Sequence, residues 1–311
     1  MSLFSIISNL FLITNLITIP INNNFYVQEN ITEEGVNFFN IQSEKINKEN
    51  TYPIKNTNDS IGAKISAKSV LIENSKNNKT LWSKNSDEIR PIASITKLMT
   101  ALVLLESKNI DWEKEIVIDK SDLNSDFNKL NIYNWEKIKF KDLFISSLIA
   151  SSNTGIEILI KNTGISEKNF VSKMNDKAIE IGLNKTKFDD PTGLSANNVS
   201  TAKEVLKLAK KAFSYPNIKE ATSNKNYSFR TIDSNRLIYV KNTNELIGGY
   251  LNIEAGKTGY TESAGFCLVS EVSYQDQGPI LVVVLGSESH YERFSDLKTI
   301  ATWTFNNYSW E

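Results

Sequence analysis

The sequence is poor in the residues that build metal sites and most hydrolytic triads. It holds one cysteine, Cys267, and one histidine, His290, in 311 residues. A single cysteine excludes an internal disulfide bond and a cysteine-rich metal site. Cys267 lies in "GFCLVSEV", a pattern typical of a packed strand, and His290 lies in "SESHYERF", the expected exposed start of a last helix. We therefore expect no metal, no cofactor and a catalytic base other than histidine.

An excess of charge of either sign is also missing. Lysine and arginine together number 35, aspartate and glutamate 36, and the net charge is -1. A chain that neutralises a phosphate backbone needs a basic excess, so we expect no nucleic-acid partner. With 40% hydrophobic residues, the composition suits a globular domain with a full core.

The N-terminal part lacks basic residues, because no lysine or arginine occurs before Lys45. Residues 1–20 are apolar with scattered Ser, Asn and Thr, which fits a signal peptide or a spanning helix poorly. We still predict that residues 1–20 are an export or membrane-anchor segment. Residues 21–61 are rich in Asn, Glu and Lys, which predicts a flexible linker, and residues 62–311 are the expected folded domain.

The order of apolar patterns in residues 62–311 predicts an α+β fold. A strand pair around an Asn-rich turn comes first, then several helical segments, and four strand patterns follow after about Tyr215. Thr201 and Glu204 stand at capping-box spacing, and Gly182 is placed to end a helix. We predict an antiparallel sheet flanked by helices.

One lysine stands in an apolar helix. "PIASITKLMTALVLL" is apolar almost all round after Lys97, as expected for a buried helix. Ser94 is three residues earlier, so the hydroxyl and the amine share one helix face. Burial and the helix N-terminus both disfavour a charged amine, so we expect the pKa of Lys97 to fall and the amine to act as base for a Ser94 nucleophile. The alternative is a core lysine that extends its amine to solvent.

Two further motifs follow in chain order. Ser151-Ser152-Asn153 stands between two predicted helices, and Lys257-Thr258-Gly259 stands on a predicted strand. Alone, the first is also explained by a turn that caps a helix, and the second by a hairpin turn with a solvated lysine. Together with Ser94 and Lys97, they resemble the motif set of penicillin-binding proteins and class A β-lactamases.

The resemblance extends beyond the motifs. "IRPIASITKLMTALVLLE", "FDDPTGLSANNVSTAKEVLKLAKKAFSYP" and "NTNELIGGYLNIEAGKTGYTESAGFCLVS" are similar to the low-molecular-mass penicillin-binding proteins, the serine D-alanyl-D-alanine carboxypeptidase family. Two features differ from many members: Ser152 stands where they have glycine, and we expect this chain to lack their C-terminal β-rich domain and amphipathic anchor.

The resemblance implies a role for each motif residue. Ser94 would be the nucleophile, Lys97 its base, Ser151 the donor to the leaving amine and Asn153 a ligand of the substrate backbone. Lys257 and Thr258 would bind the substrate carboxylate, Gly259 would allow close approach, and the N–H of Tyr260 would be an oxyanion donor. We expect a penicillin-sensitive D-Ala-D-Ala carboxypeptidase that trims peptidoglycan stem peptides in the bacterial cell envelope.

Three alternatives remain open. The same site would serve a D,D-endopeptidase that cuts cross-links. A class A-like β-lactamase would need a deacylating glutamate, and Glu180 begins a matching "EIGLN". However, a helical stripe of Phe170, Met174, Ala178 and Ile181 runs into that match, so Glu180 is predicted to lie in the exposed last turn of a helix. The third alternative is a catalytically silent cell-wall-binding module.

Overall fold

The computed structural model describes residues 20–21, 25–26, 28–30, 38–40, 52–56, 60, 62–107, 110–124 and 129–310. The chain divides into two units, Met1–Thr51 and Tyr52–Glu311. The first unit contains two strand pairs, and the export segment predicted at residues 1–20 lies almost wholly outside the described residues. The paired strands are β1 (Pro20–Ile21) with β2 (Phe25–Tyr26) and β3 (Gln28–Asn30) with β4 (Phe38–Asn40).

The second unit is built on a five-stranded antiparallel sheet, which confirms the predicted α+β class. The strand order is β14-β15-β16-β6-β7. The bounds are Asn252–Thr261 for β14, Gly265–Tyr274 for β15, Gln277–Ser287 for β16, Ser69–Asn74 for β6 and Thr80–Lys84 for β7.

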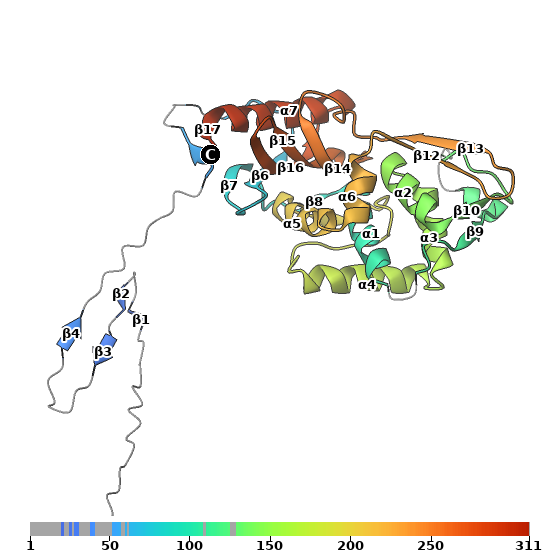
Figure 1. Cartoon of the computed structure of the whole chain (residues 1–311), viewed down its shortest axis with the longest axis horizontal. Coiled ribbons are helices and arrows are strands. Elements are labelled where there is room, and N and C mark those ends of the chain that lie inside the picture. The colour runs from blue at the N-terminus through green and yellow to red at the C-terminus, as the bar shows by residue number, and fades with distance from the viewer. Residues whose placement is uncertain are drawn as a thin grey trace, which may run out of the picture. The chain divides into compact units, whose positions relative to one another are not determined.

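Helices cover both faces of this sheet (Figure 1). Along β16, Ile280, Val282 and Val284 pack in the core shared with α7 (His290–Asn307). The alternate residues Leu281 and Val283 belong to the core shared with α1 (Lys97–Glu106) and α5 (Ala202–Phe213). Successive side chains of a strand point to opposite faces, so a strand covered on both faces is apolar throughout. The run "PILVVVLGS" follows from this double coverage.

The remaining helices form a second lobe beside the sheet. It contains α2 (Phe140–Ala150), α3 (Asn153–Asn162), α4 (Glu167–Glu180) and α6 (Pro216–Ser223), with the short 3-10 helices η1 (Ala93–Thr96) and η2 (Lys120–Asn124). Three two-stranded ribbons complete it: β8 (Arg90–Pro91) with β11 (Val199–Ser200), β9 (Glu115–Val117) with β10 (Lys137–Lys139), and β12 (Asn226–Arg230) with β13 (Leu237–Lys241). Helix α6 stands where the sequence predicted the start of strands, with Pro216 at its first position.

The folded unit begins earlier than the predicted residue 62. Strand β5 (Ile54–Lys55) pairs with β17 (Tyr308–Ser309) after the last helix. The indole N–H of Trp303 donates a hydrogen bond of 2.7 Å to the Ser60 hydroxyl. These contacts join residues that are far apart in the chain, so the local composition from which residues 21–61 were predicted to be a linker carries no sign of them.

Two predicted helix boundaries can be compared in detail. Gly182 has φ of +71° just after α4, as expected for a residue that ends a helix. The Thr201 hydroxyl accepts a hydrogen bond of 3.1 Å from the N–H of Glu204 and caps α5. The Glu204 carboxylate instead accepts hydrogen bonds from Lys185 and Thr186, so only half of the predicted capping box forms.

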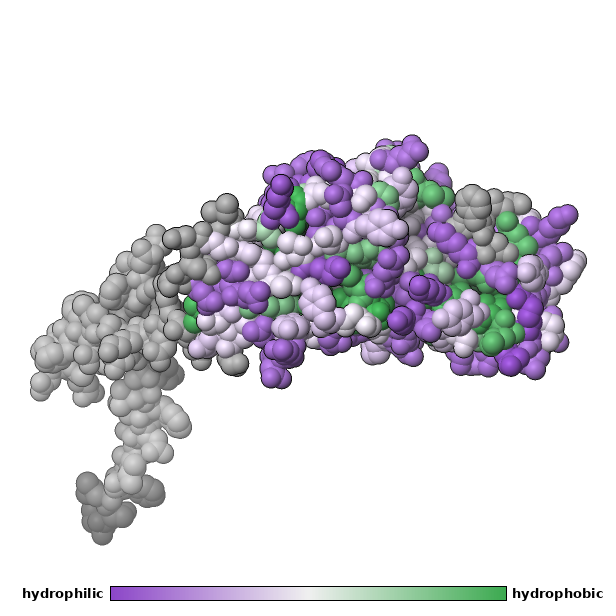
Figure 2. All heavy atoms as spheres, turned by 90° about the horizontal axis from the view of Figure 1, so that it is seen from above, coloured by the Kyte–Doolittle hydropathy of each residue, from purple (hydrophilic) through white to green (hydrophobic). Residues whose placement is uncertain are grey.

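The surface differs from this interior. Figure 2 shows one face, on which hydrophilic residues predominate and hydrophobic residues form small separate areas. Among the helices that the structure describes, none combines the length and the hydropathy needed to cross a membrane.

Candidate active site

Ser94 and Lys97 lie where η1 leads into α1. The sequence predicted Ser94 in the first turn of the α-helix, whereas the structure places it in the preceding 3-10 turn. Ala93 has φ of +48°, so the chain turns sharply just before Ser94. The Lys97 amine is 3.0 Å from the Ser94 hydroxyl, and the lysine is completely buried while Ser94 is half-buried. The two side chains therefore meet just below the surface, and Lys97 does not extend to solvent.

The surroundings of the Lys97 amine orient it toward Ser94. Besides Ser94, Nζ contacts Oδ1 of Asn153 at 2.5 Å and the carbonyl oxygen of Thr192 at 2.6 Å. Both oxygens can only accept hydrogen bonds. In a neutral amine, the two N–H groups are directed to these acceptors and the lone pair is left facing the Ser94 hydroxyl. This arrangement suits an amine that takes a proton from serine.

The three side chains of the Ser151–Asn153 loop make different contacts. Ser151 adopts the left-handed conformation (φ +54°) at the end of α2. The Ser152 hydroxyl caps α3 by accepting the N–H of Gly155 at 3.1 Å. Ser152 therefore has the helix-capping role that was the structural alternative for this motif. Ser151 and Asn153 are buried. The Ser151 hydroxyl contacts the amine of Lys257, and Asn153 contacts that of Lys97.

The Lys257 amine forms a hydrogen bond with the Ser151 hydroxyl. Its Nζ lies 2.7 Å from the Ser151 hydroxyl and 2.9 Å from the carbonyl oxygen of Thr258. The hydroxyl of Thr258 shares a hydrogen bond of 2.6 Å with that of Thr243. Lys257 lies on β14, its side chain is buried, and its amine contacts two oxygen atoms. The alternative of a solvated lysine on a turn is therefore wrong.

Gly259 lets β14 approach the Ser94 backbone. A Cβ atom on Gly259 would lie 2.9 Å from the carbonyl oxygen of Ile92 and 3.1 Å from the Ser94 nitrogen. Any side chain would push the strand away, so the glycine permits the close approach of β14 to the backbone of Ser94. The ring of Tyr260 is half-exposed and stacks on Phe266 at 4.2 Å.

Several basic side chains lie near Lys257 on β14. Burial, together with the nearby charges of Lys97, Lys129 and Arg293, holds the pKa of Lys257 well below its usual range. Arg293 on α7 is itself buried and donates to the carbonyl oxygen of Gly259 at 3.3 Å. Arg293 was not predicted from the sequence, because an arginine in the first turn of a helix carries no local sign of burial.

Cys267 and His290 do not form a second catalytic pair. Burial raises the pKa of the Cys267 thiol to about 11, which keeps the thiol protonated. His290 is partly exposed and contacts Glu245 at 2.9 Å and Arg293 at 3.1 Å. Among the described residues, no three His, Cys, Asp or Glu side chains gather as a metal site.

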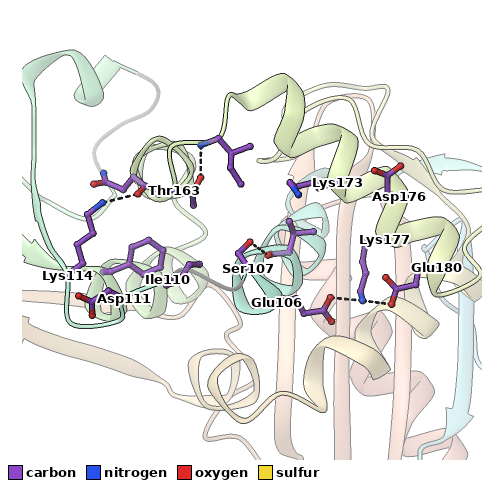
Figure 3. A pocket seen from close by; sticks show the side chains of 14 residues that line it. Glu106, Ser107, Ile110, Asp111, Lys114, Thr163, Lys173, Asp176, Lys177 and Glu180 are labelled. Carbon is purple, nitrogen blue, oxygen red and sulfur yellow. Dashed lines mark hydrogen bonds and ion pairs between the residues drawn. The ribbon is translucent and has the colours of Figure 1, made fainter.

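Glu180 lies at the far end of α1 from the Ser94 cluster. Its side chain is 66% exposed and pairs with Lys177 at 2.6 Å, and Lys177 also pairs with Glu106 (Figure 3). These residues line a separate cavity of about 650 Å³. Glu106 is the last residue of α1 and Lys97 the first, so about 14 Å of helix separates them. The structure thus confirms the expected position of Glu180 at the exposed end of a helix.

Solved structures with this fold identify the class of protein. The DD-transpeptidase of Streptomyces K15 matches with a TM-score of 0.72 and 26% identity, covering 79% of this chain and all of that one. Penicillin-binding protein D2 from Listeria monocytogenes, in its cefotaxime-bound form, matches with a TM-score of 0.68 and 26% identity over 79% of this chain. The fold is that of the serine β-lactamases and penicillin-binding proteins.

The sequence itself defines the family within this class. Residues 35–289 match the profile of the D-alanyl-D-alanine carboxypeptidases. A D-alanyl-D-alanine endopeptidase from Pseudomonas aeruginosa is 35% identical over 240 residues, or 76% of each chain. The carboxypeptidase DacF of Bacillus subtilis is 29% identical over 78% of this chain and 63% of its own. This chain belongs to the D-alanyl-D-alanine carboxypeptidase family, and it is a serine DD-peptidase acting on peptidoglycan.

Proposed function

We propose that this DD-peptidase works through an acyl-enzyme on Ser94. Lys97 takes the hydroxyl proton as Ser94 Oγ attacks the carbonyl carbon of the penultimate D-alanine, and the C–N bond then breaks to give an ester. Water attacks that ester and releases the shortened peptide. The observation that carries this proposal is the 3.0 Å contact of the two side chains, combined with the two acceptors that aim the lone pair of Lys97 at Ser94.

Ser151 protonates the leaving amine in this mechanism. Because Lys257 donates to the Ser151 oxygen, the hydroxyl hydrogen of Ser151 is left to point into the site. The positive charge of Lys257 also makes that hydroxyl a better acid. Ser151 then regains a proton from Lys97, which holds the proton that it took from Ser94. Asn153 orients the substrate backbone while its Oδ1 holds Lys97.

The remaining motif residues bind charge. The N–H groups of Ser94 and Tyr260 stabilise the oxyanion that forms during attack. The Thr258 hydroxyl, with the charges of Lys257 and Arg293 behind it, attracts the carboxylate of the substrate or of a β-lactam. In the free protein, burial and nearby charges lower the pKa of Lys257. The carboxylate of a bound substrate raises that pKa again, so Lys257 carries its charge when substrate is in place.

Between the two peptidase reactions, we favour cleavage of cross-links. Relatives named as endopeptidases are 35% and 32% identical to this chain, whereas the carboxypeptidase DacF is 29% identical. Trimming of D-alanine from uncross-linked stem peptides is the second candidate, favoured by the matched family profile. A purified sample offered equal amounts of a cross-linked muropeptide dimer and a pentapeptide monomer decides between them by the product that forms first.

The location we propose is the bacterial cell envelope, outside the cytoplasm, because the substrate is peptidoglycan. Residues 1–20 would then export the chain or anchor it to the membrane. Release of the full chain from membranes by high salt alone would argue against an anchor.

The nucleophile is tested with penicillin and intact-mass measurement. Ser94→Ala should abolish the penicilloyl adduct and leave the thermal midpoint within about 2 °C, since a half-buried hydroxyl is replaced without a cavity. Ser214→Ala, an exposed serine after α5, is the matched control and should acylate normally. An adduct that persists in Ser94→Ala would contradict the assignment, and a parent protein that forms no adduct would favour the silent cell-wall-binding module.

A further inference from the structure

A single carboxylate organises the loop that faces Lys97. Asp190 follows α4 by ten residues and accepts six hydrogen bonds of 2.6 to 3.4 Å. The donors are the N–H groups of Thr192, Gly193, Leu194 and Ser195, the hydroxyl of Thr192 and the side-chain amide of Asn198. Successive backbone N–H groups that converge on one anion form a nest. The conformation of the loop therefore depends on the charge at its centre.

The Asp190 carboxylate is held in its ionised form. Burial opposes ionisation, but the hydrogen bonds from Thr192, Ser195 and Gly193 outweigh it and lower the pKa of Asp190 below its ordinary value. An ionised carboxylate only accepts hydrogen bonds, so all six donors are satisfied. An asparagine in this position would turn an NH₂ group toward donors, and the nest would open.

The loop contacts the nucleophile segment on both sides of Ser94. The Thr192 carbonyl oxygen lies 2.6 Å from the Lys97 amine, and the carbonyl of Asn198 accepts the N–H of Ile92 at 3.0 Å. Gly193, with φ of +91°, lies so close that a Cβ atom would be 2.1 Å from the carbonyl oxygen of Ala93. The carbonyl of Pro191 also accepts the Thr100 hydroxyl one turn along α1.

We propose that Asp190 is a positioning residue for acylation, which it assists by holding the Thr192 carbonyl against Lys97. This inference rests on the proposed role of Lys97 as the base. A neutral amine has two N–H groups and one lone pair. With Asn153 and Thr192 both in place, the lone pair faces Ser94. Without the Thr192 carbonyl, one N–H turns to the Ser94 oxygen, and that rotamer of the amine cannot take the serine proton.

The test uses time courses of penicillin acylation by the full chain at several penicillin concentrations. Asp190→Asn should lower the limiting acylation rate constant ten- to hundredfold, the cost of a misplaced catalytic group. The half-saturating penicillin concentration should stay within about twofold, because Asp190 contacts none of the proposed carboxylate-binding residues. If Asp190 only stabilised the fold, the substitution would lower the folded fraction. It would then change both the limiting rate constant and the half-saturating concentration, or neither of them.

Asp189→Asn is the matched control. It removes the same charge one residue away. The exposed Asp189 carboxylate accepts hydrogen bonds from the side chains of Ser195 and Asn197, and the Asp189 backbone N–H, which the substitution keeps, binds Asn198. This variant should acylate at the parent rate. Equal rates for Asp190→Asn and Asp189→Asn would overturn the positioning role.

A milder variant keeps the proposal testable if Asp190→Asn fails to fold. Thr192→Val keeps the size of the side chain and removes one of the six donors, so the limiting rate constant should fall at least threefold; an unchanged rate would overturn the proposal. Lys97→Ala tests the proposed function separately. If the parent acylates and Lys97→Ala acylates as fast, then the proposed base is wrong whatever Asp190 does.

Discussion

At the residue scale, the site buries two lysine amines, those of Lys97 and Lys257. Lys257 is paired with a hydroxyl and a carbonyl oxygen, both neutral. These neutral partners accept hydrogen bonds from the amine but do not compensate its charge, and the charge of Arg293 adds repulsion. This buried charge lowers the free energy of unfolding, whereas it assists acylation.

We expect Lys257→Met to stabilise the protein and to abolish efficient acylation. The folded state holds the pKa of Lys257 below its unfolded value near 10.5, so between those two values the unfolded chain binds more protons. The parent therefore gains stability as pH rises through that window, and the methionine variant does not. Its thermal midpoint should exceed that of the parent by about 2–4 °C at pH 7.

Thermal unfolding at pH 7 and pH 9 checks this directly. The difference between the variant and the parent should shrink at pH 9, because the parent gains stability between pH 7 and pH 9 while the variant does not. A methionine variant that is less stable at both pH values would mean that the hydrogen bonds of Lys257 outweigh its buried charge.

At the scale of elements, close backbone approach holds η1, β14 and the Asp190 loop together. Two glycines make this possible: Gly259 on the strand side and Gly193 on the loop side of the Ser94 segment. A side chain at either position would move the segment that carries Ser94. The position of the nucleophile is thus set by three elements that meet through main-chain atoms.

Replacing Gly193 by alanine should slow penicillin acylation at least tenfold. The new Cβ atom would clash with the backbone of Ala93, and φ of +91° is strained for alanine. Gly164→Ala is the matched control, since Gly164 also has positive φ (+75°) but no atom within 4 Å of a Cβ. It should cost about 1 kcal/mol of stability and leave acylation unchanged. Equal acylation rates in the two variants would show that the approach at Gly193 does not position Ser94.

At the scale of the whole molecule, the functional regions are separated by the length of α1. Ser94 and its partners lie at one end, and the Glu106, Lys177 and Glu180 ion pairs lie at the other. A β-lactamase requires a base close to the acyl ester, and Glu180 lies too far away to act on it. This separation argues for slow deacylation of penicillin.

Glu180→Ala should therefore leave the lifetime of the penicilloyl adduct within about twofold of the parent, a change of ~0.4 kcal/mol in barrier. The adduct itself should last for minutes or longer, as followed by intact mass after removal of excess penicillin. Rapid turnover that disappears in Glu180→Ala would identify a β-lactamase instead.

A second test at this scale concerns the start of the folded unit. A chain that begins at Tyr52 should unfold at the same temperature as the full chain, because it keeps the β5 and β17 pair. A chain that begins at Gly62 loses that pair and the Ser60 contact with Trp303, so its thermal midpoint should fall by at least about 2 °C. Equal midpoints would mean that this terminal strand pair adds nothing to stability.

Local patterns alone determined much of this protein. The apolar run of β16, the buried helix after Lys97 and the stop at Gly182 follow from periodicity and backbone preference, which are properties of neighbouring residues. The family resemblance carried by the three motifs predicted that their side chains would gather, and contacts link Ser94 to Lys97, Lys97 to Asn153, and Ser151 to Lys257. The helical end position of Glu180 also followed from a stripe of four apolar residues.

Only the tertiary structure decided how those side chains work. Asn153 and Thr192 reach Lys97 from 56 and 95 residues away, and the Thr192 group is a backbone carbonyl. Every residue carries such a carbonyl, so no residue type marks the one that meets the amine. Arg293 and Asp190 were missed for the same reason: burial and convergent hydrogen bonds arise when distant segments pack, and local propensity does not encode them.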